Sequence, residues 1–204
     1  MFKIAVLISG GGSNLQAIID NIENGYLNCS IECVISDKKD AFGLERARRH
    51  NIKTYVFDKK EYGVELSYRI LETLENKVDL IVLAGYLSIL NCDVVKKFKD
   101  KIINVHPSLI PSFCGKGMYG IKVHEKALEY GVKITGCTVH FVDEGTDTGS
   151  IIIQKAVEVK DDDTAESLQK RVLEQEHKAL SEAIKLISEN EVHVNGRKTI
   201  IKGI

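Results

Sequence analysis

The chain has 204 residues, 44% of them hydrophobic and 28% charged, and its formal net charge is -1. These values are ordinary for a globular protein with one substantial core, and they exclude the basic surface that nucleic-acid binding requires. The apolar run near the N-terminus, residues 4–8, is too short for a membrane span or a signal-peptide core, so we expect a cytoplasmic protein without a nucleic-acid or membrane partner.

Short apolar runs alternate with amphipathic stretches through the first half of the chain. A buried strand at residues 2–8 is followed by a helix that Ser13 or Asn14 can cap and Gly25 can stop. The alternation predicts an α/β fold with a Rossmann-like, mostly parallel sheet flanked by helices. The other expected strands are 31–35, 53–57, 78–84 and 102–105, and the other expected helices are 42–51, 60–76 and 91–98.

The second half has a different pattern. Two extended apolar segments, 134–142 and 151–159, are joined by an acidic loop. A long helix follows at about 164–189, with Asp163 or Thr164 as its cap. A terminal hairpin is expected at 192–201, around the favoured turn sequence at residues 195–196.

The cysteine pattern argues against a disulfide framework. The count is odd and no C-x-x-C pair occurs, so we expect reduced thiols, buried or half-buried, and no metal site. The five cysteines are Cys29, Cys33, Cys92, Cys114 and Cys137.

Ligands of a parallel α/β sheet bind outside the carboxyl ends of its strands. Three polar segments follow strands and are expected at that edge: residues 9–14, residues 85–90 and the residues from 106 onward.

The glycine-rich segment at residues 9–14 is the first of these. A Walker P-loop ends in glycine, lysine and then serine or threonine. It is excluded here because Lys116, which follows Gly115, is itself followed by Gly117. A dinucleotide fingerprint needs glycine where Leu15 stands, which argues against a nicotinamide site. Asp37, however, lies where an acidic residue would meet a ribose, so that site stays open as an alternative. A tight turn without any ligand is a second alternative. A site for one terminal phosphate fits best. Its expected ligands are Gly11, Gly12, Ser13 and Asn14.

Asn104 and His106 lie two residues apart at the end of a predicted strand, so their side chains face the same side. Pro107 ends the strand directly after the histidine. The pair would place a donor amide beside a titratable imidazole at the ligand-binding edge. The alternative interpretation is that His106 is a core histidine whose hydrogen bonds are satisfied.

The acidic loop at residues 143–149 follows the strand that carries His140. It could be a solvated hairpin loop. Alternatively, Gly145 and Gly149 let it fold over a site and bring in a carboxylate. A carboxylate beside His106 would favour imidazolium and fix its orientation.

At these segments the chain resembles the phosphoribosylglycinamide formyltransferase family, which are folate-dependent enzymes of purine synthesis. The resemblance runs over about residues 2–187. Its matching stretches are residues 6–18, 41–47, 82–86, 104–109, 139–142, 146–149 and 175–177.

The resemblance implies transfer of a formyl group from 10-formyltetrahydrofolate to the amine of N1-(5-phospho-D-ribosyl)glycinamide, with Asn104, His106 and Asp147 as catalytic residues. It implies a single domain, 1–204, with a phosphate-binding half at about 1–100, a catalytic and folate-binding half at about 101–190, and a hairpin tail at 191–204. The implied ribonucleotide ligands are Gly11, Gly12, Ser13, Asn14, Pro107 and Glu176. The implied folate-binding residues are Lys59, Leu83, Tyr86, Leu87, Ser88, Ile89, Leu90, Asn104, Val142, Asp143 and Asp147, with His140 and Ser108 behind the reacting groups.

The expected mechanism is direct attack of the amine on the formyl carbon. Asn104 and a protonated His106 would donate to the oxyanion, each such donor contributing about 3–4 kcal/mol. Asp147 would hold the histidine as a cation and order the water that moves a proton. Neither a metal nor a nicotinamide is required, and the expected partners are the two small molecules, with the protein a monomer or homodimer.

The chain departs from the family pattern in three places. Ser88 stands where many relatives carry arginine, the loop at residues 113–120 is longer than in several relatives, and Ser150 replaces a frequent proline. Methionyl-tRNA formyltransferases and formyltetrahydrofolate deformylases share the same core chemistry. The former usually carry a further C-terminal domain and the latter an N-terminal one, so the length of this chain favours the ribonucleotide substrate.

Overall fold

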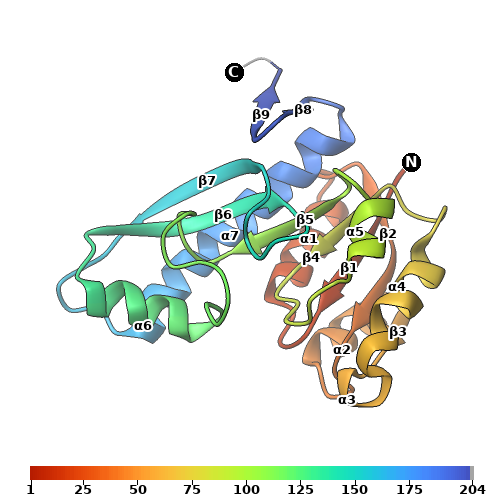
Figure 1. Ribbon diagram of the computed structural model, residues 1–204, viewed down its shortest axis with the longest axis horizontal. Helices are drawn as coiled ribbons and strands as arrows, with labels where there is room; N and C mark the ends of the chain where they lie inside the picture. Colours follow the sequence, from red (N-terminus) through yellow and green to blue (C-terminus); the bar gives the residue numbers. More distant parts are fainter. Residues whose placement is uncertain (203–204) are drawn as a thin grey trace. The chain divides into compact units, whose positions relative to one another are not determined.

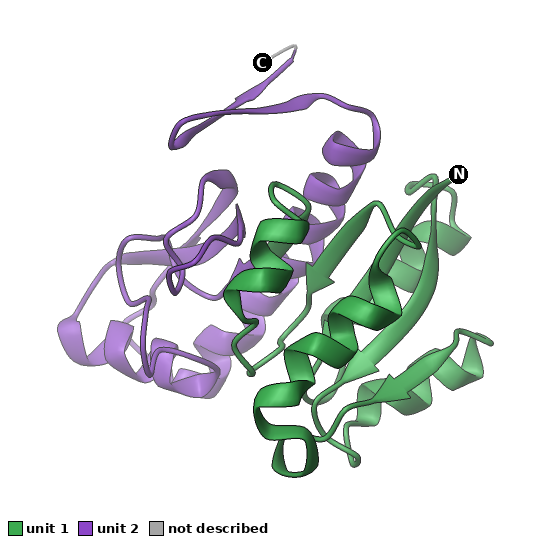
Figure 2. Cartoon of the chain, turned by 45° about the vertical axis from the view of Figure 1, so that its right-hand side comes forward, with its two compact units in different colours: residues 1–104 green, residues 105–204 purple. Residues whose placement is uncertain are grey.

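The computed structural model describes residues 1–202, and the chain forms two compact units, Met1–Asn104 and Val105–Ile204 (Figure 2). The first unit alternates strands and helices as predicted (Figure 1). Its elements are β1 (Phe2–Ile8), α1 (Ser13–Glu23), β2 (Cys29–Ser36), α2 (Phe42–Arg49), β3 (Thr54–Val56), α3 (Lys59–Tyr62), the 3-10 helix η1 (Gly63–Glu65), α4 (Leu66–Leu74), β4 (Leu80–Leu83), α5 (Cys92–Lys97) and β5 (Ile102–His106), whose last two residues belong to the second unit.

The strands of the first unit are parallel and lie in the order β3-β2-β1-β4-β5. The order reverses beside β1, and right-handed crossovers therefore place α1 and α2 on one face and α4 and α5 on the other. Because both faces are covered, residues 4–8 of β1 are buried throughout.

The loops after β1 and β4 meet at the carboxyl edge of this sheet. The amide of Ser9 donates to the carbonyl of Gly85 at 3.1 Å, and the amide of Leu87 donates to the Ser9 hydroxyl at 2.8 Å. The expected meeting of these two polar segments is confirmed.

Three details of the first unit differ from the predictions. Gly12, with a φ of 70°, precedes α1, and no side chain caps that helix, so the predicted caps Ser13 and Asn14 are wrong. The helix predicted at 60–76 is divided into α3, η1 and α4, because Gly63 takes a φ of 49° that interrupts the helical turn. Cys92 is exposed rather than buried or half-buried.

The second unit is built around one long helix. Helix α7 packs on β6, β7 and α6, and its N-terminus is a capping box made by Thr164 and Ser167, which confirms one of the two predicted caps. Strand β6 pairs antiparallel with β7, β7 pairs parallel with β9, and β9 pairs antiparallel with β8. The bounds are α6 (Ile121–Tyr130), β6 (Ile134–Phe141), β7 (Ile151–Glu158), α7 (Ala165–Ser188), β8 (Val192–Asn195) and β9 (Lys198–Ile201).

Two features of the second unit were not predicted. Helix α6 was missed, although Val123 and Ala127 lie on one buried face and Gly131 ends it in a left-handed conformation. The terminal hairpin turns at residues 196–197, one position later than predicted, because Asn195 still pairs with Lys198.

The α/β fold class is confirmed, including the mostly parallel sheet, the long C-terminal helix and the terminal hairpin. The assignment of 1–204 to a single functional domain with the halves given above stays a prediction. Within residues 1–202, no helix is both long enough and apolar enough to span a membrane.

A buried hydroxyl fixes the segment that follows β5. Thr138 on β6 is fully buried, and its Oγ1 donates to the carbonyl of Ser108 at 2.7 Å. The same oxygen accepts from the amide of Ile110 and from Nε2 of Gln154, each at 3.0 Å. One side chain therefore satisfies the backbone carbonyl of the buried Ser108 and the amide of the buried Ile110, while the exposed Gln154 also donates to the Ile110 carbonyl at 3.0 Å.

We expect Thr138→Val to lower the free energy of unfolding by about 1–3 kcal/mol, because the isosteric methyl leaves buried polar groups unsatisfied. Urea denaturation measures the change. Thr135→Val is the matched control on the same strand, since the buried Thr135 hydroxyl has no hydrogen-bond partner within residues 1–202. The control should lose no stability, and equal losses in both variants would contradict the assigned role of Thr138.

Candidate active site

Strand β5 carries Asn104 and His106 two positions apart, with Asn104 half-buried and His106 buried. Because both residues lie in the same strand, two positions apart, their side chains face the same side of that strand. Ring atom Nε2 of His106 lies 2.9 Å from the carbonyl oxygen of Phe113.

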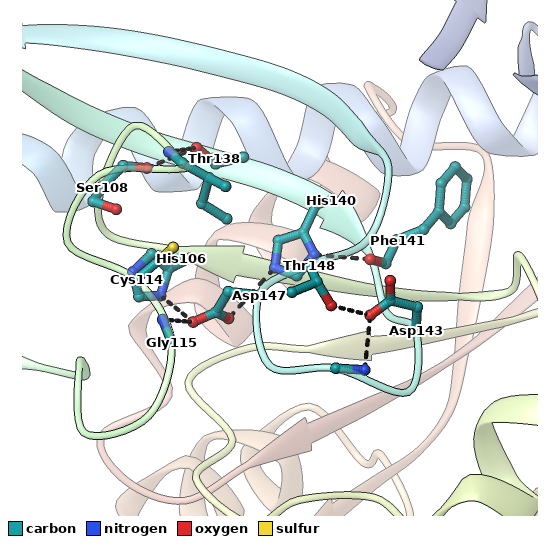
Figure 3. Close-up of polar contacts among 12 residues, drawn as sticks. His106, Ser108, Cys114, Gly115, Thr138, His140, Phe141, Asp143, Asp147 and Thr148 are labelled. Atoms are coloured by element: carbon teal, nitrogen blue, oxygen red, sulfur yellow. Dashed lines mark hydrogen bonds and ion pairs between the residues drawn. The ribbon is translucent and has the colours of Figure 1, made fainter. Parts of the chain in front are cut away.

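Asp147 lies between two imidazoles (Figure 3). Its Oδ2 is 3.6 Å from Nδ1 of His106, and its Oδ1 is 3.7 Å from Nε2 of His140. The amide of Gly115 donates to Oδ2 at 2.9 Å. The carboxylate side chain is only 11% exposed, so solvent screens these contacts far less than it screens a surface ion pair.

The hydrogen-bond partners fix which nitrogens carry protons. A carbonyl oxygen only accepts, so His106 donates from Nε2 to Phe113. By the same rule, His140 donates from Nδ1 to the carbonyl of Phe141 at 2.8 Å. Burial lowers the pKa of His140 and favours its neutral form. A second proton on His106 would face Asp147, so the imidazolium form of His106 has an acceptor for each donor.

The loop that presents Asp147 is braced from within. Asp147 has a φ of 58°, a left-handed conformation that aspartate and asparagine tolerate better than most residues. Oδ1 of Asp143 accepts from the Gly145 amide at 3.0 Å and from the Thr148 hydroxyl. At Gly149 a Cβ atom would collide with the carbonyl oxygen of Phe141, so only glycine fits there. The acidic segment is exposed at residues 143–146 and 148, and its internal hydrogen bonds together with the close approach at Gly149 give it a defined shape.

The segment at residues 113–115 contacts both His106 and Asp147. The carbonyl of Phe113 meets the histidine, and the amide of Gly115 donates to the carboxylate. Cys114 lies between them, and burial together with the Asp147 carboxylate raises the pKa of its thiol. That environment disfavours the thiolate, so Cys114 is a poor nucleophile. His124 on α6 is also buried, and burial together with His106 lowers its pKa to about 4, which keeps it neutral.

In the first unit, the glycine loop lies at the N-terminus of α1 as predicted. Gly11 is exposed, Gly12 and Ser13 are half-buried, and Asn14 is buried. The first-turn amides have no acceptor within their own helix, and the helix dipole favours an anion beside them.

Asp37 argues against the nicotinamide interpretation. Its carboxylate is 3% exposed, and Oδ2 accepts from the Ser88 hydroxyl at 2.6 Å. A carboxylate that is buried in this way is not presented to a ribose. The same bond gives Ser88 a structural role, joining the end of β2 to the loop after β4.

The predicted folate-binding residues divide by exposure. Ile89 is 80% exposed and Leu87 is 47% exposed, so these two offer apolar surface to a ligand. Burial and the nearby Asp37 raise the pKa of Tyr86. Leu83, Tyr86, Ser88 and Leu90 are buried, Val142 is half-buried, and Lys59 and Asp143 are exposed.

The remaining predicted residues lie in the second unit. Glu176 on α7 is buried, and its charge adds to the burial that raises the pKa of Cys137 to about 12. Pro107 is half-buried, and the buried Ser108 donates from its hydroxyl to the carbonyl of Ser112 at 2.6 Å. The contacts from residues 113–115 could not be predicted from the sequence, because they are made by backbone groups.

Comparison with known proteins places these features in a family. A family model described as formyl transferase matches residues 2–184. The chain is 40% identical to a phosphoribosylglycinamide formyltransferase of Haemophilus influenzae, with 100% of this chain and 95% of that protein covered. It is 46% identical to the trifunctional purine biosynthetic protein adenosine-3 of Gallus gallus over 94% of this chain, but it spans only 19% of that protein's length.

A solved structure agrees in fold. The crystal structure of glycinamide ribonucleotide transformylase 1 from Symbiobacterium toebii has a TM-score of 0.92 and 43% sequence identity, covering 98% of this chain and 94% of that one. The chain therefore belongs to the formyl transferase family.

Proposed function

We propose that this protein transfers the formyl group of 10-formyltetrahydrofolate to the amine of N1-(5-phospho-D-ribosyl)glycinamide, a step of de novo purine biosynthesis. The observation that carries the proposal is the buried carboxylate beside His106, in a chain of this family whose full-length relative in Haemophilus influenzae is named for this activity. The glycine loop at the start of α1 supports a phosphorylated acceptor.

The proposed chemistry is a direct transfer. The amine lone pair attacks the formyl carbon, and the carbonyl oxygen becomes an oxyanion. The amine then loses a proton, N10 of the folate gains one, and the bond between carbon and N10 breaks. The products are the formylated amine and tetrahydrofolate. No step needs a metal or a nicotinamide.

Each proposed catalytic residue has a separate task. Asn104 donates a neutral amide hydrogen to the oxyanion, while His106 donates a charged one through the Nε2–H that meets the Phe113 carbonyl in this structure. Asp147 favours the imidazolium and guides the proton between amine and N10. His140, kept neutral by burial, packs against the other side of Asp147 without donating to it, because its one proton, on Nδ1, is donated to the Phe141 carbonyl.

The binding roles are assigned as follows. The glycine loop takes the phosphate, Glu176 takes the glycinamide amine, and Pro107 borders the ribonucleotide. The exposed apolar Leu87 and Ile89 support a folate site beside the loop after β4. The free thiols are consistent with the reducing cytoplasm, where we place the enzyme as a monomer or homodimer.

The first test mixes purified protein with 10-formyltetrahydrofolate, with and without glycinamide ribonucleotide, and follows folate product by absorbance. Product that forms only with the ribonucleotide is expected, because the amine is the attacking group. Release without any acceptor would identify a deformylase instead, and no release under either condition would contradict formyl transfer.

Replacing Asp147 by Asn tests the proton-handling role. We expect kcat to fall about 100-fold or more, while both KM values stay within about threefold, because the charge is needed for the reaction rather than for binding. Asparagine tolerates the left-handed backbone of this position, so the loop should keep its shape. Glu144→Gln, at an exposed position of the same loop, is the control for lost charge. A parallel loss of kcat and affinity in Asp147→Asn would contradict the role.

A further inference from the structure

Helix α2 supplies hydrogen-bond donors to the carbonyl side of the glycine loop. The amide of Gly43 donates to the carbonyl of Gly10 at 3.0 Å, and Nε of Arg46 donates to the carbonyl of Gly11 at 2.8 Å. A loop that binds an anion must turn its carbonyl oxygens away and its amides inward. These two bonds hold successive carbonyl groups on the side of α2.

The contact between α2 and the loop leaves no room for side chains. A Cβ atom on Gly12 would lie 2.6 Å from Cα of Gly43. A Cβ atom on Gly43 would lie 2.5 Å from Cδ1 of Ile8 and 3.1 Å from Cα of Gly12. The loop and the first turn of α2 are thus in direct backbone contact, so a small shift of one is transmitted to the other.

The guanidinium of Arg46 is held in place by two further contacts. Its Nη1 donates to Oε1 of Gln16 at 3.2 Å, and its Cζ lies 5.1 Å from the centre of the Phe42 ring. Gln16 belongs to α1, the helix whose N-terminus the glycine loop precedes. Arg46 therefore connects the loop, α1 and α2, unlike an arginine that is free in solvent.

We propose that Arg46 is a positioning residue of the phosphate site, acting through the carbonyl of Gly11. By fixing that carbonyl it orients the peptide between Gly11 and Gly12, so that the following amide faces the phosphate. Its charge also opposes the repulsion between carbonyl oxygens and the anion. This role rests on the proposed function, because it assigns the residue that shapes the acceptor's phosphate site.

Arg46→Met removes the donor and the charge. We expect it to raise KM for the ribonucleotide about tenfold, which corresponds to one hydrogen bond to a charged group, and to leave KM for the folate and kcat unchanged. The inhibition constant of inorganic phosphate, measured against the ribonucleotide, should rise by a similar factor. A purely structural role would lower the activity of the folded fraction for both substrates alike.

Arg49→Met is the matched control, since it removes the same charge from the same helix. Arg49 contacts Glu45 at 3.1 Å and lies over the Phe42 ring at 6.0 Å, so it should leave the ribonucleotide KM unchanged. If Arg46→Met folds poorly, Gln16→Met loosens the guanidinium instead and should raise the same KM about threefold.

The outcomes separate this inference from the proposed function. Equal ribonucleotide KM values in Arg46→Met and Arg49→Met, with unchanged phosphate inhibition, would overturn the role of Arg46 while wild-type transfer still stands. A wild-type protein that transfers no formyl group to the ribonucleotide would overturn the proposed function itself. A selective rise of KM and of the phosphate inhibition constant in Arg46→Met supports the inference.

Discussion

The position of the Asp147 carboxylate, between two imidazoles and largely shielded from water, is the constraint on which the candidate site of the second unit depends. Burying a carboxylate is costly unless charges and donors compensate it. Here the compensation comes from the amide of Gly115 and, when Nδ1 of His106 is protonated, from that ring. The left-handed backbone at Asp147 and the tight approach at Gly149 exist to deliver that carboxylate. The loop therefore follows from an electrostatic requirement.

The two histidines beside this carboxylate are differentiated by their surroundings. His140 is desolvated and donates to a carbonyl from Nδ1, which favours a neutral ring. His106 has an acceptor opposite each nitrogen, which accommodates a cation. Similar residues thus take different roles because of where their protons can go. The proposed anion site of the first unit is different, since it consists of peptide groups whose carbonyls accept hydrogen bonds from Gly43 and Arg46.

The sequence predicted well what periodicity and turn chemistry determine. The alternation of buried strands and amphipathic helices located most elements to within a few residues, and the pair Asn104 and His106 followed from strand geometry. Helix α6 was missed because it follows a glycine-rich loop and begins after Gly120, so no capping side chain marks its start. The helix at 60–76 was predicted as continuous because nothing but Gly63 signalled its break.

Contacts between distant backbone groups were not predictable. The carbonyl of Phe113 on His106 and the amide of Gly115 on Asp147 belong to groups that every residue carries, so no side-chain pattern announces them. The bond from Arg46 to Gly11 has the same origin. The departure at Ser88 became interpretable only when Asp37 was seen to accept its hydroxyl.

We propose that Asp147 favours a doubly protonated His106, because its Oδ2 faces Nδ1 of the ring while the Phe113 carbonyl faces Nε2. Nitrogen-15 NMR of the histidine rings, recorded at the pH of maximal activity, tests it most directly, with Asp147→Asn as the comparison. We expect both nitrogens of His106 to carry protons in the wild-type protein and one of these protons to be lost in the variant. A singly protonated His106 in the wild-type protein, unchanged by the substitution, would contradict it.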